Sequence, residues 1–79
     1  IDLLIETQYT LYVCEIKFRK KIERSVIDEV SEKINRLNYP STLSIRPVLI
    51  YAGGLAENIE ATGFFAKIVS FEALLTTKI

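Results

Sequence analysis

The stretch Tyr9-Thr10-Leu11-Tyr12-Val13-Cys14-Glu15-Ile16-Lys17-Phe18 is rich in aromatic and β-branched residues, and it predicts a β-strand. Successive side chains of a strand point to opposite faces of a sheet. One face of this strand is wholly apolar and consists of Tyr12, Cys14, Ile16 and Phe18. Leu11 and Val13 bring apolar side chains to the other face as well. A strand that is apolar on both faces is typical of the centre of a sheet covered above and below.

A second strand precedes it, because Asp2–Glu6 contains the apolar run Leu3-Leu4-Ile5. The two strands predict a β-hairpin with a turn around Thr7-Gln8. With that two-residue turn, Asp2 lies opposite Val13, and Glu15 is its diagonal neighbour on the same face, ~7–8 Å away between Cα atoms. A loop with an odd number of residues and no bulge would instead send Asp2 to the other face.

The period of the apolar residues changes downstream, which predicts a helix from about Glu23 to Leu37. Its apolar stripe consists of Ile22, Val26, Val30, Ile34 and Leu37. Ser25 and Asp28 resemble a capping box at its start, with Asp in place of the usual Glu. Two further pairs, Glu29 with Lys33 and Glu32 with Arg36, have the spacing of stabilising ion pairs along a helix.

The rest of the chain predicts a second buried strand at Ile45–Ala52, a turn at Gly53-Gly54, and a mostly irregular segment from Leu55 to Phe65 with room for one helical turn. A short fourth strand is expected at Lys67–Phe71, followed by a helical stub at Phe71–Thr76. The predicted fold is therefore a small mixed α/β sheet of about four strands, a β-hairpin followed by a right-handed βαβ unit. Its one substantial helix covers one face of the sheet and leaves the other bare.

Composition limits the classes of function. The 79 residues allow one domain, 1–79, and the net charge of zero excludes a uniformly basic nucleic-acid binder. The chain has no His and one Cys, which excludes Ser-His-Asp catalysis, most zinc sites and an internal disulfide. No apolar run is long enough to span a bilayer and no signal peptide is evident, so we expect a soluble protein in the reducing cytoplasm and no membrane partner.

Hydrolytic chemistry is suggested by three charged residues. Glu15 and Lys17 share a face of an otherwise apolar strand, where burial of charge is expensive without a partner. With Asp2 nearby, two carboxylates could hold Mg²⁺ or Mn²⁺, which would polarise a scissile phosphate and lower the pKa of a bound water. Lys17 could orient that water or offset charge in the transition state. The alternative is an ordinary salt bridge at the end of a sheet.

The same residues resemble a known superfamily. Asp2, Glu15-Ile16-Lys17 on the next strand, an amphipathic helix and a buried strand resemble the PD-(D/E)XK, or restriction-endonuclease-like, nucleases. The segments at 1–5, 14–18 and 45–50 are similar to the C-terminal domain of archaeal-type AAA+ ATPases. The resemblance implies a nuclease-like domain in which Asp2, Glu15 and Lys17 are catalytic and the two acids bind the metal.

The chain departs from that pattern in two respects. The superfamily's opening helix and the strand leading into its motif have no counterpart, so we expect a truncated domain that lacks part of the restriction-endonuclease-like core. No phosphate-binding G-x-x-x-x-G-K-[ST] loop is present, so no nucleotide-binding site is expected in this chain. The alternative function is a non-catalytic interaction or dimerisation module in which the nuclease-like site is inactive.

Two partners are expected. A basic cluster follows the strand that carries Lys17 and could hold a nucleic-acid backbone; it consists of Arg19, Lys20, Lys21 and Arg24. A solvated loop and helix start would have the same composition. The apolar content of 49% exceeds what so short a chain can easily bury, and together with the bare face of the sheet it predicts a homodimer or a missing piece of the same domain.

Overall fold

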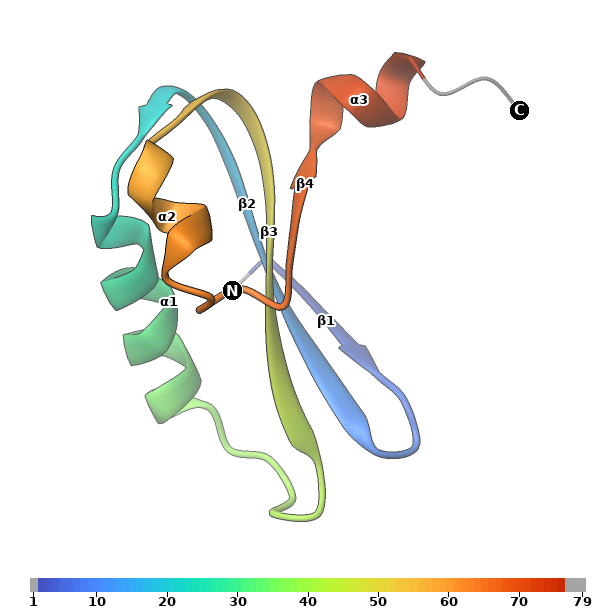
Figure 1. Ribbon diagram of the computed structural model, residues 1–79. Coiled ribbons are helices and arrows are strands. Elements are labelled where there is room, and N and C mark those ends of the chain that lie inside the picture. Colours follow the sequence, from blue (N-terminus) through green and yellow to red (C-terminus); the bar gives the residue numbers. More distant parts are fainter. Residues whose placement is uncertain (1, 77–79) are drawn as a thin grey trace.

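The fold is a four-stranded mixed sheet with helices, seen in a computed structural model that describes residues 2–76 (Figure 1). Its elements in chain order are β1 (Leu3–Glu6), β2 (Thr10–Ile22), α1 (Ser25–Arg36), β3 (Ser44–Leu55), α2 (Glu57–Ala61), β4 (Lys67–Ser70) and α3 (Phe71–Thr76). None of the helices within this range is long and apolar enough to cross a membrane.

The sheet has the predicted topology. Its strand order is β1-β2-β3-β4; β1 and β2 are antiparallel, whereas β2 pairs with β3, and β3 with β4, in parallel. The hairpin and the βαβ unit β2-α1-β3 are therefore both present, and β2 lies inside the sheet as its two apolar faces predicted.

The predicted register of the hairpin is wrong by two residues. Glu6 pairs with Leu11 and Leu4 with Val13, so a four-residue loop replaces the expected Thr7-Gln8 turn. The loop is closed by Thr7, whose N–H donates to the Thr10 carbonyl at 2.8 Å and whose hydroxyl accepts from the Thr10 N–H at 3.1 Å. Because four is also an even number, the expectation that Asp2 shares a face with Glu15 survives the change in register.

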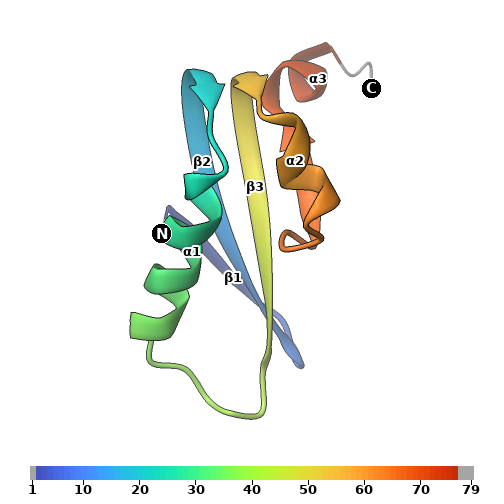
Figure 2. The same ribbon diagram turned by 60° about the vertical axis from the view of Figure 1, so that its left-hand side comes forward.

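Two helices, α1 and α2, lie on the same face of the sheet (Figures 1 and 2). The buried core between them and the sheet consists of Ile22, Val26, Val30, Leu49, Ile59 and Phe65. The predicted apolar stripe of α1 thus packs inward, and Glu32 and Arg36 form the predicted ion pair. The predicted capping box is wrong, because Arg24 precedes the helix in a helical conformation and no side chain caps it.

The Gly53-Gly54 pair is not a turn but part of β3, which continues to Leu55. Opposite these glycines β2 contains a β-bulge between Arg19 and Lys21. Gly53 has φ of +103°, and a Cβ there would lie 1.7 Å from the Arg19 carbonyl oxygen. Glycine at this position allows β2 and β3 to approach closely, so the pairing of the two strands continues to Ile22 and Leu55.

Candidate functional site

Glu15 is the buried charged residue at the centre of the candidate site. It lies in the middle of β2 on the face covered by α1, between the buried Val13 and the half-buried Lys17. Its side chain is 1% exposed. An ionised carboxylate at that depth needs cationic partners to offset the loss of its hydration.

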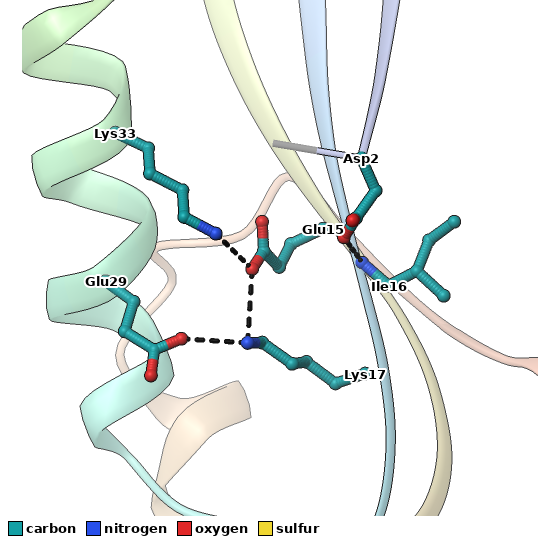
Figure 3. Close-up of polar contacts among 6 residues, drawn as sticks. All are labelled: Asp2, Glu15, Ile16, Lys17, Glu29 and Lys33. Carbon is teal, nitrogen blue, oxygen red and sulfur yellow. Dashed lines mark hydrogen bonds and ion pairs between the residues drawn. The ribbon is translucent and has the colours of Figure 1, made fainter.

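Lys17 supplies one of these partners. Its Nζ lies 3.3 Å from Glu15 Oε2 and 2.9 Å from Glu29 Oε2, and the Lys17 side chain is 12% exposed (Figure 3). The strand alternation that the sequence indicated thus brings the two charges of the Glu15-Ile16-Lys17 motif into contact. Both side chains extend from β2 toward α1.

Two residues of α1 complete a network that sequence reasoning missed. Lys33 Nζ lies 2.9 Å from Glu15 Oε2, so this oxygen contacts two ammonium groups, while Glu29 contacts Lys17. Glu29 and Lys33 are one helical turn apart and were expected to pair with each other along the helix. Their ion pairs within 4.0 Å instead run to β2, which links α1 to the sheet through alternating charges.

The network shifts the pKa of its two helical members in opposite directions. The hydrogen bond from Lys17 lowers the pKa of the Glu29 carboxyl below its ordinary value. The hydrogen bond to Glu15 raises the pKa of the Lys33 ammonium. Both shifts favour the charged forms of these two side chains, Glu29 and Lys33.

Asp2 lies beside this network and directly precedes β1. The register of β1 and β2, continued by one residue beyond Leu3 and Cys14, places Asp2 opposite Glu15. Its carboxylate turns to the backbone, where Oδ2 accepts a hydrogen bond from the Ile16 N–H at 2.8 Å (Figure 3). Asp2 and Glu15 are therefore adjacent in the sheet, but their carboxylates have different partners.

The two carboxylates would have to rearrange to hold a divalent cation together, because Asp2 Oδ2 accepts from the Ile16 N–H and Glu15 Oε2 contacts Lys17 and Lys33. Within residues 2–76 no cluster of three or more His, Cys, Asp or Glu side chains could hold a metal ion. Asp2 and Glu15 together offer two carboxylates, and Mg²⁺ commonly binds through one or two carboxylates while it keeps several waters. Bound there, the ion would compete with the ammonium groups of Lys17 and Lys33 for Glu15 Oε2.

The basic cluster lies further along β2, at the end where α1 begins. All four of its members, Arg19, Lys20, Lys21 and Arg24, are exposed. Lys21 and Arg24 also line an open hollow of about 630 Å³ together with Glu23 and residues 55–58. Lys20 lies five residues beyond Glu15, which corresponds to ~16 Å at the rise of a strand.

Cys14, on the face opposite Glu15, is 3% exposed and acts as the small core residue that the sequence predicted. Burial raises the pKa of its thiol.

Comparisons of the whole chain with protein-family models, curated proteins and solved structures found no match. The assignment of a function therefore depends on the geometry described above.

Proposed function

We propose that this chain is a nuclease-like domain that hydrolyses phosphodiester bonds with the help of Mg²⁺ or Mn²⁺. Asp2 and Glu15 would hold the metal, and Lys17 would be the catalytic lysine. The observation that carries the proposal is the 3.3 Å contact of Lys17 Nζ with Glu15 Oε2, beside Asp2, whose Oδ2 accepts a hydrogen bond from the Ile16 N–H. The proposal also rests on the resemblance of the sequence to PD-(D/E)XK nucleases.

Each protein group has a distinct part in the proposed reaction. A bound divalent cation would polarise the phosphate and lower the pKa of a coordinated water. The Lys17 ammonium, 12% exposed, would offset the negative charge that builds on the phosphate oxygens in the transition state. Glu29, whose Oε2 lies 2.9 Å from Lys17 Nζ, would orient that ammonium.

The exposed basic cluster of Arg19, Lys20, Lys21 and Arg24 would hold the nucleic-acid backbone. Contacts to phosphate are independent of sequence and weaken as salt increases. We therefore expect binding to DNA and RNA oligonucleotides that falls with salt and with the charge reversals Lys20→Glu and Lys21→Glu. Fluorescence anisotropy of labelled single-stranded and double-stranded oligonucleotides would measure it, and binding equal to wild type in both variants would remove the cluster from the proposal.

The assignment of the metal ligands can be tested with variants that separate binding from folding. Asp2 is exposed, so Asp2→Asn should leave the fold intact while it removes one ligand. Mn²⁺ is expected to raise the thermal midpoint of the wild-type chain, and to do so less in Asp2→Asn and Glu15→Gln. Glu32→Gln is the matched control, since Glu32 is an exposed acid on α1 that pairs with Arg36.

Cleavage of a labelled oligonucleotide in the same Mn²⁺ buffer tests the chemistry. Activity should be lost in Glu15→Gln and Lys17→Met and kept in Glu32→Gln, with circular dichroism showing that each variant is folded. Cleavage that is equal in wild type and Glu15→Gln would refute the catalytic assignment. A separate observation, the exposed apolar face of the sheet, favours a second function as a dimerisation module.

A further inference from the structure

The face of the sheet opposite α1 and α2 is apolar and open. In Figures 1 and 2 no described helix crosses its middle, and α3 stands only at its upper end. Strand alternation and the registers place on this open face the apolar residues Leu3, Ile5, Tyr12, Cys14, Ile16, Phe18, Val48, Ile50 and Val69. The exposed Lys67, which pairs with Val48, lies on the same face at its β4 edge. At the upper end Phe71 of α3 contacts Phe18, with ring centroids 5.0 Å apart.

Four of these apolar side chains are highly exposed, Cys14 is buried and the remaining four are half-buried. Leu3 is 44% exposed, Ile5 46%, Ile16 38% and Phe18 58%. Each strand residue covers about 3.3 Å by 4.8 Å, so strands of 4, 13, 12 and 4 residues make a plane of roughly 500 Å². That plane falls short of the ~800 Å² per partner of a standard interface and is in the range of weak, reversible association.

The outline of the open face is complementary to itself. β1 pairs only with the first half of β2, up to Cys14, whereas β4 pairs with β3 only from Val48 onward. Within residues 2–76, no strand therefore lies beside Phe18 at one corner or beside Arg46 at the diagonally opposite corner. If a second copy packs face to face with its strands antiparallel, its β1 covers the first vacant corner and its β4 the second.

Charge follows the same arrangement. Arg46 is exposed at the lower end of the face. Glu72, which has the opposite charge, is exposed at the upper end in α3 and accepts a hydrogen bond from the Gly53 N–H. The antiparallel arrangement brings Arg46 of each copy toward Glu72 of the other. A parallel arrangement would place like ends together and gain no such pair.

We propose that two copies of this chain associate through their open faces as a two-fold symmetric dimer, with the axis lying between the sheets and running across the strands. The packing is that of an aligned β-sandwich, in which two apolar faces interdigitate. The limited area predicts a dissociation constant in the micromolar range. The proposal does not depend on the metal site, which lies on the other face of the sheet.

Neighbouring residues of β1 provide the matched pair for the test. Leu3 and Leu4 are 44% and 45% exposed, but they lie on opposite faces of the sheet. Sedimentation velocity from low micromolar to submillimolar concentration should show a reversible monomer–dimer equilibrium for the wild-type chain and for Leu4→Lys. Leu3→Lys should weaken the dimer by at least ~10-fold, because it places a charge in the apolar interface.

A charge reversal tests the relative orientation. Arg46→Glu should weaken the dimer, and the added change Glu72→Arg should restore it, because the pair is re-formed with opposite polarity. Circular dichroism would establish that each variant is folded. A wild-type chain that remains monomeric at submillimolar concentration would overturn the proposal and assign the face to another protein or another segment. Equal effects of Leu3→Lys and Leu4→Lys, or open-ended assembly, would also overturn it.

Discussion

Removal of the Lys33 ammonium is the most informative single change to the charge network. Lys33 Nζ lies 2.9 Å from Glu15 Oε2, and Glu15 is 1% exposed. Lys33→Met keeps a long apolar side chain against the sheet but leaves the buried carboxylate with less compensation. The folded state should lose stability because the cost of dehydrating Glu15 remains while one of its cations is gone.

The expected loss follows from the burial of the pair. Breaking a fully buried ion pair by removing one partner costs ~3–5 kcal/mol. Lys33 is 37% exposed and Lys17 still contacts Glu15, so we expect a smaller loss, about 1–2 kcal/mol. For a chain of 79 residues, whose total stability is about 4–12 kcal/mol, that corresponds to a fall of roughly 5–15 °C in the thermal midpoint.

Urea unfolding followed by circular dichroism measures this loss against a control on the same helix. Arg36→Met removes the cation of an exposed pair with Glu32 and should cost no more than about 0.5 kcal/mol. In a double-mutant cycle, the variant with both Lys33→Met and Glu15→Leu should be more stable than additivity predicts, since the buried carboxylate that Lys33 compensates is also gone. Equal losses in Lys33→Met and Arg36→Met, or strict additivity in the cycle, would refute the reasoning.

The same variant separates the charge network from the proposed metal site. Lys33 and a metal ion would contact the same oxygen of Glu15, so millimolar Mn²⁺ should raise the unfolding midpoint of Lys33→Met more than that of the wild-type chain. If Mn²⁺ changes the unfolding midpoint of neither protein, the metal assignment is contradicted, whereas the conclusion about the ion-pair network is unaffected.

Three further predictions concern other parts of the fold. The hydrogen bond from Lys17 lowers the pKa of Glu29 in the folded state below its ordinary value of 4.5. The stability that ionised Glu29 contributes is therefore complete above pH 4.5 and is lost as the pH falls through the folded pKa. On acidification, the urea midpoint of Glu29→Gln should drop less than that of the wild-type chain. Burial raises the pKa of the Cys14 thiol, so iodoacetamide should modify it far more slowly in the folded chain than in urea, and equal rates would contradict its placement. Gly53→Ala places a Cβ 1.7 Å from a backbone oxygen and should lower the stability of the fold by ~3 kcal/mol or more. Gly63 has φ of +67° but open space around it, so Gly63→Ala should lower the stability by only ~1–2 kcal/mol. Thermal melts of the two variants would measure the difference.

The fold could be predicted from the sequence wherever apolar residues recur with the spacing of either a strand or a helix. The two apolar faces at Tyr9–Phe18 and the helical stripe ending at Leu37 predicted β2 and α1, and a change of period separated them. The Gly53-Gly54 pair was misinterpreted because the same residues that form turns also allow two strands to approach closely beside a bulge. Nothing local distinguishes the two roles, since the partner strand lies more than thirty residues earlier in the chain.

The candidate site was predicted only in part, for a similar reason. The alternation of side chains along one strand was sufficient to predict that Glu15 and Lys17 lie together. An even number of residues in the hairpin loop was sufficient to predict which face of the sheet Asp2 shares. The contacts of Glu29 and Lys33 depend on how α1 crosses the sheet, which the helix spacing alone does not fix. The available signal was the buried carboxylate itself, which needs cations from the helix that covers it.

The parallel pairing of β2 with β3 also affects how the chain folds. Thr10 pairs with Ser44 and Ile22 with Leu55, so a long loop must close before any of these contacts can form. Contacts between such distant residues slow folding, because the entropy of loop closure is lost before the contacts stabilise the chain. Formation of α1 shortens this loop in advance, so the speed of refolding should depend on the helical tendency of residues 25–36 more than on the strength of the N-terminal hairpin.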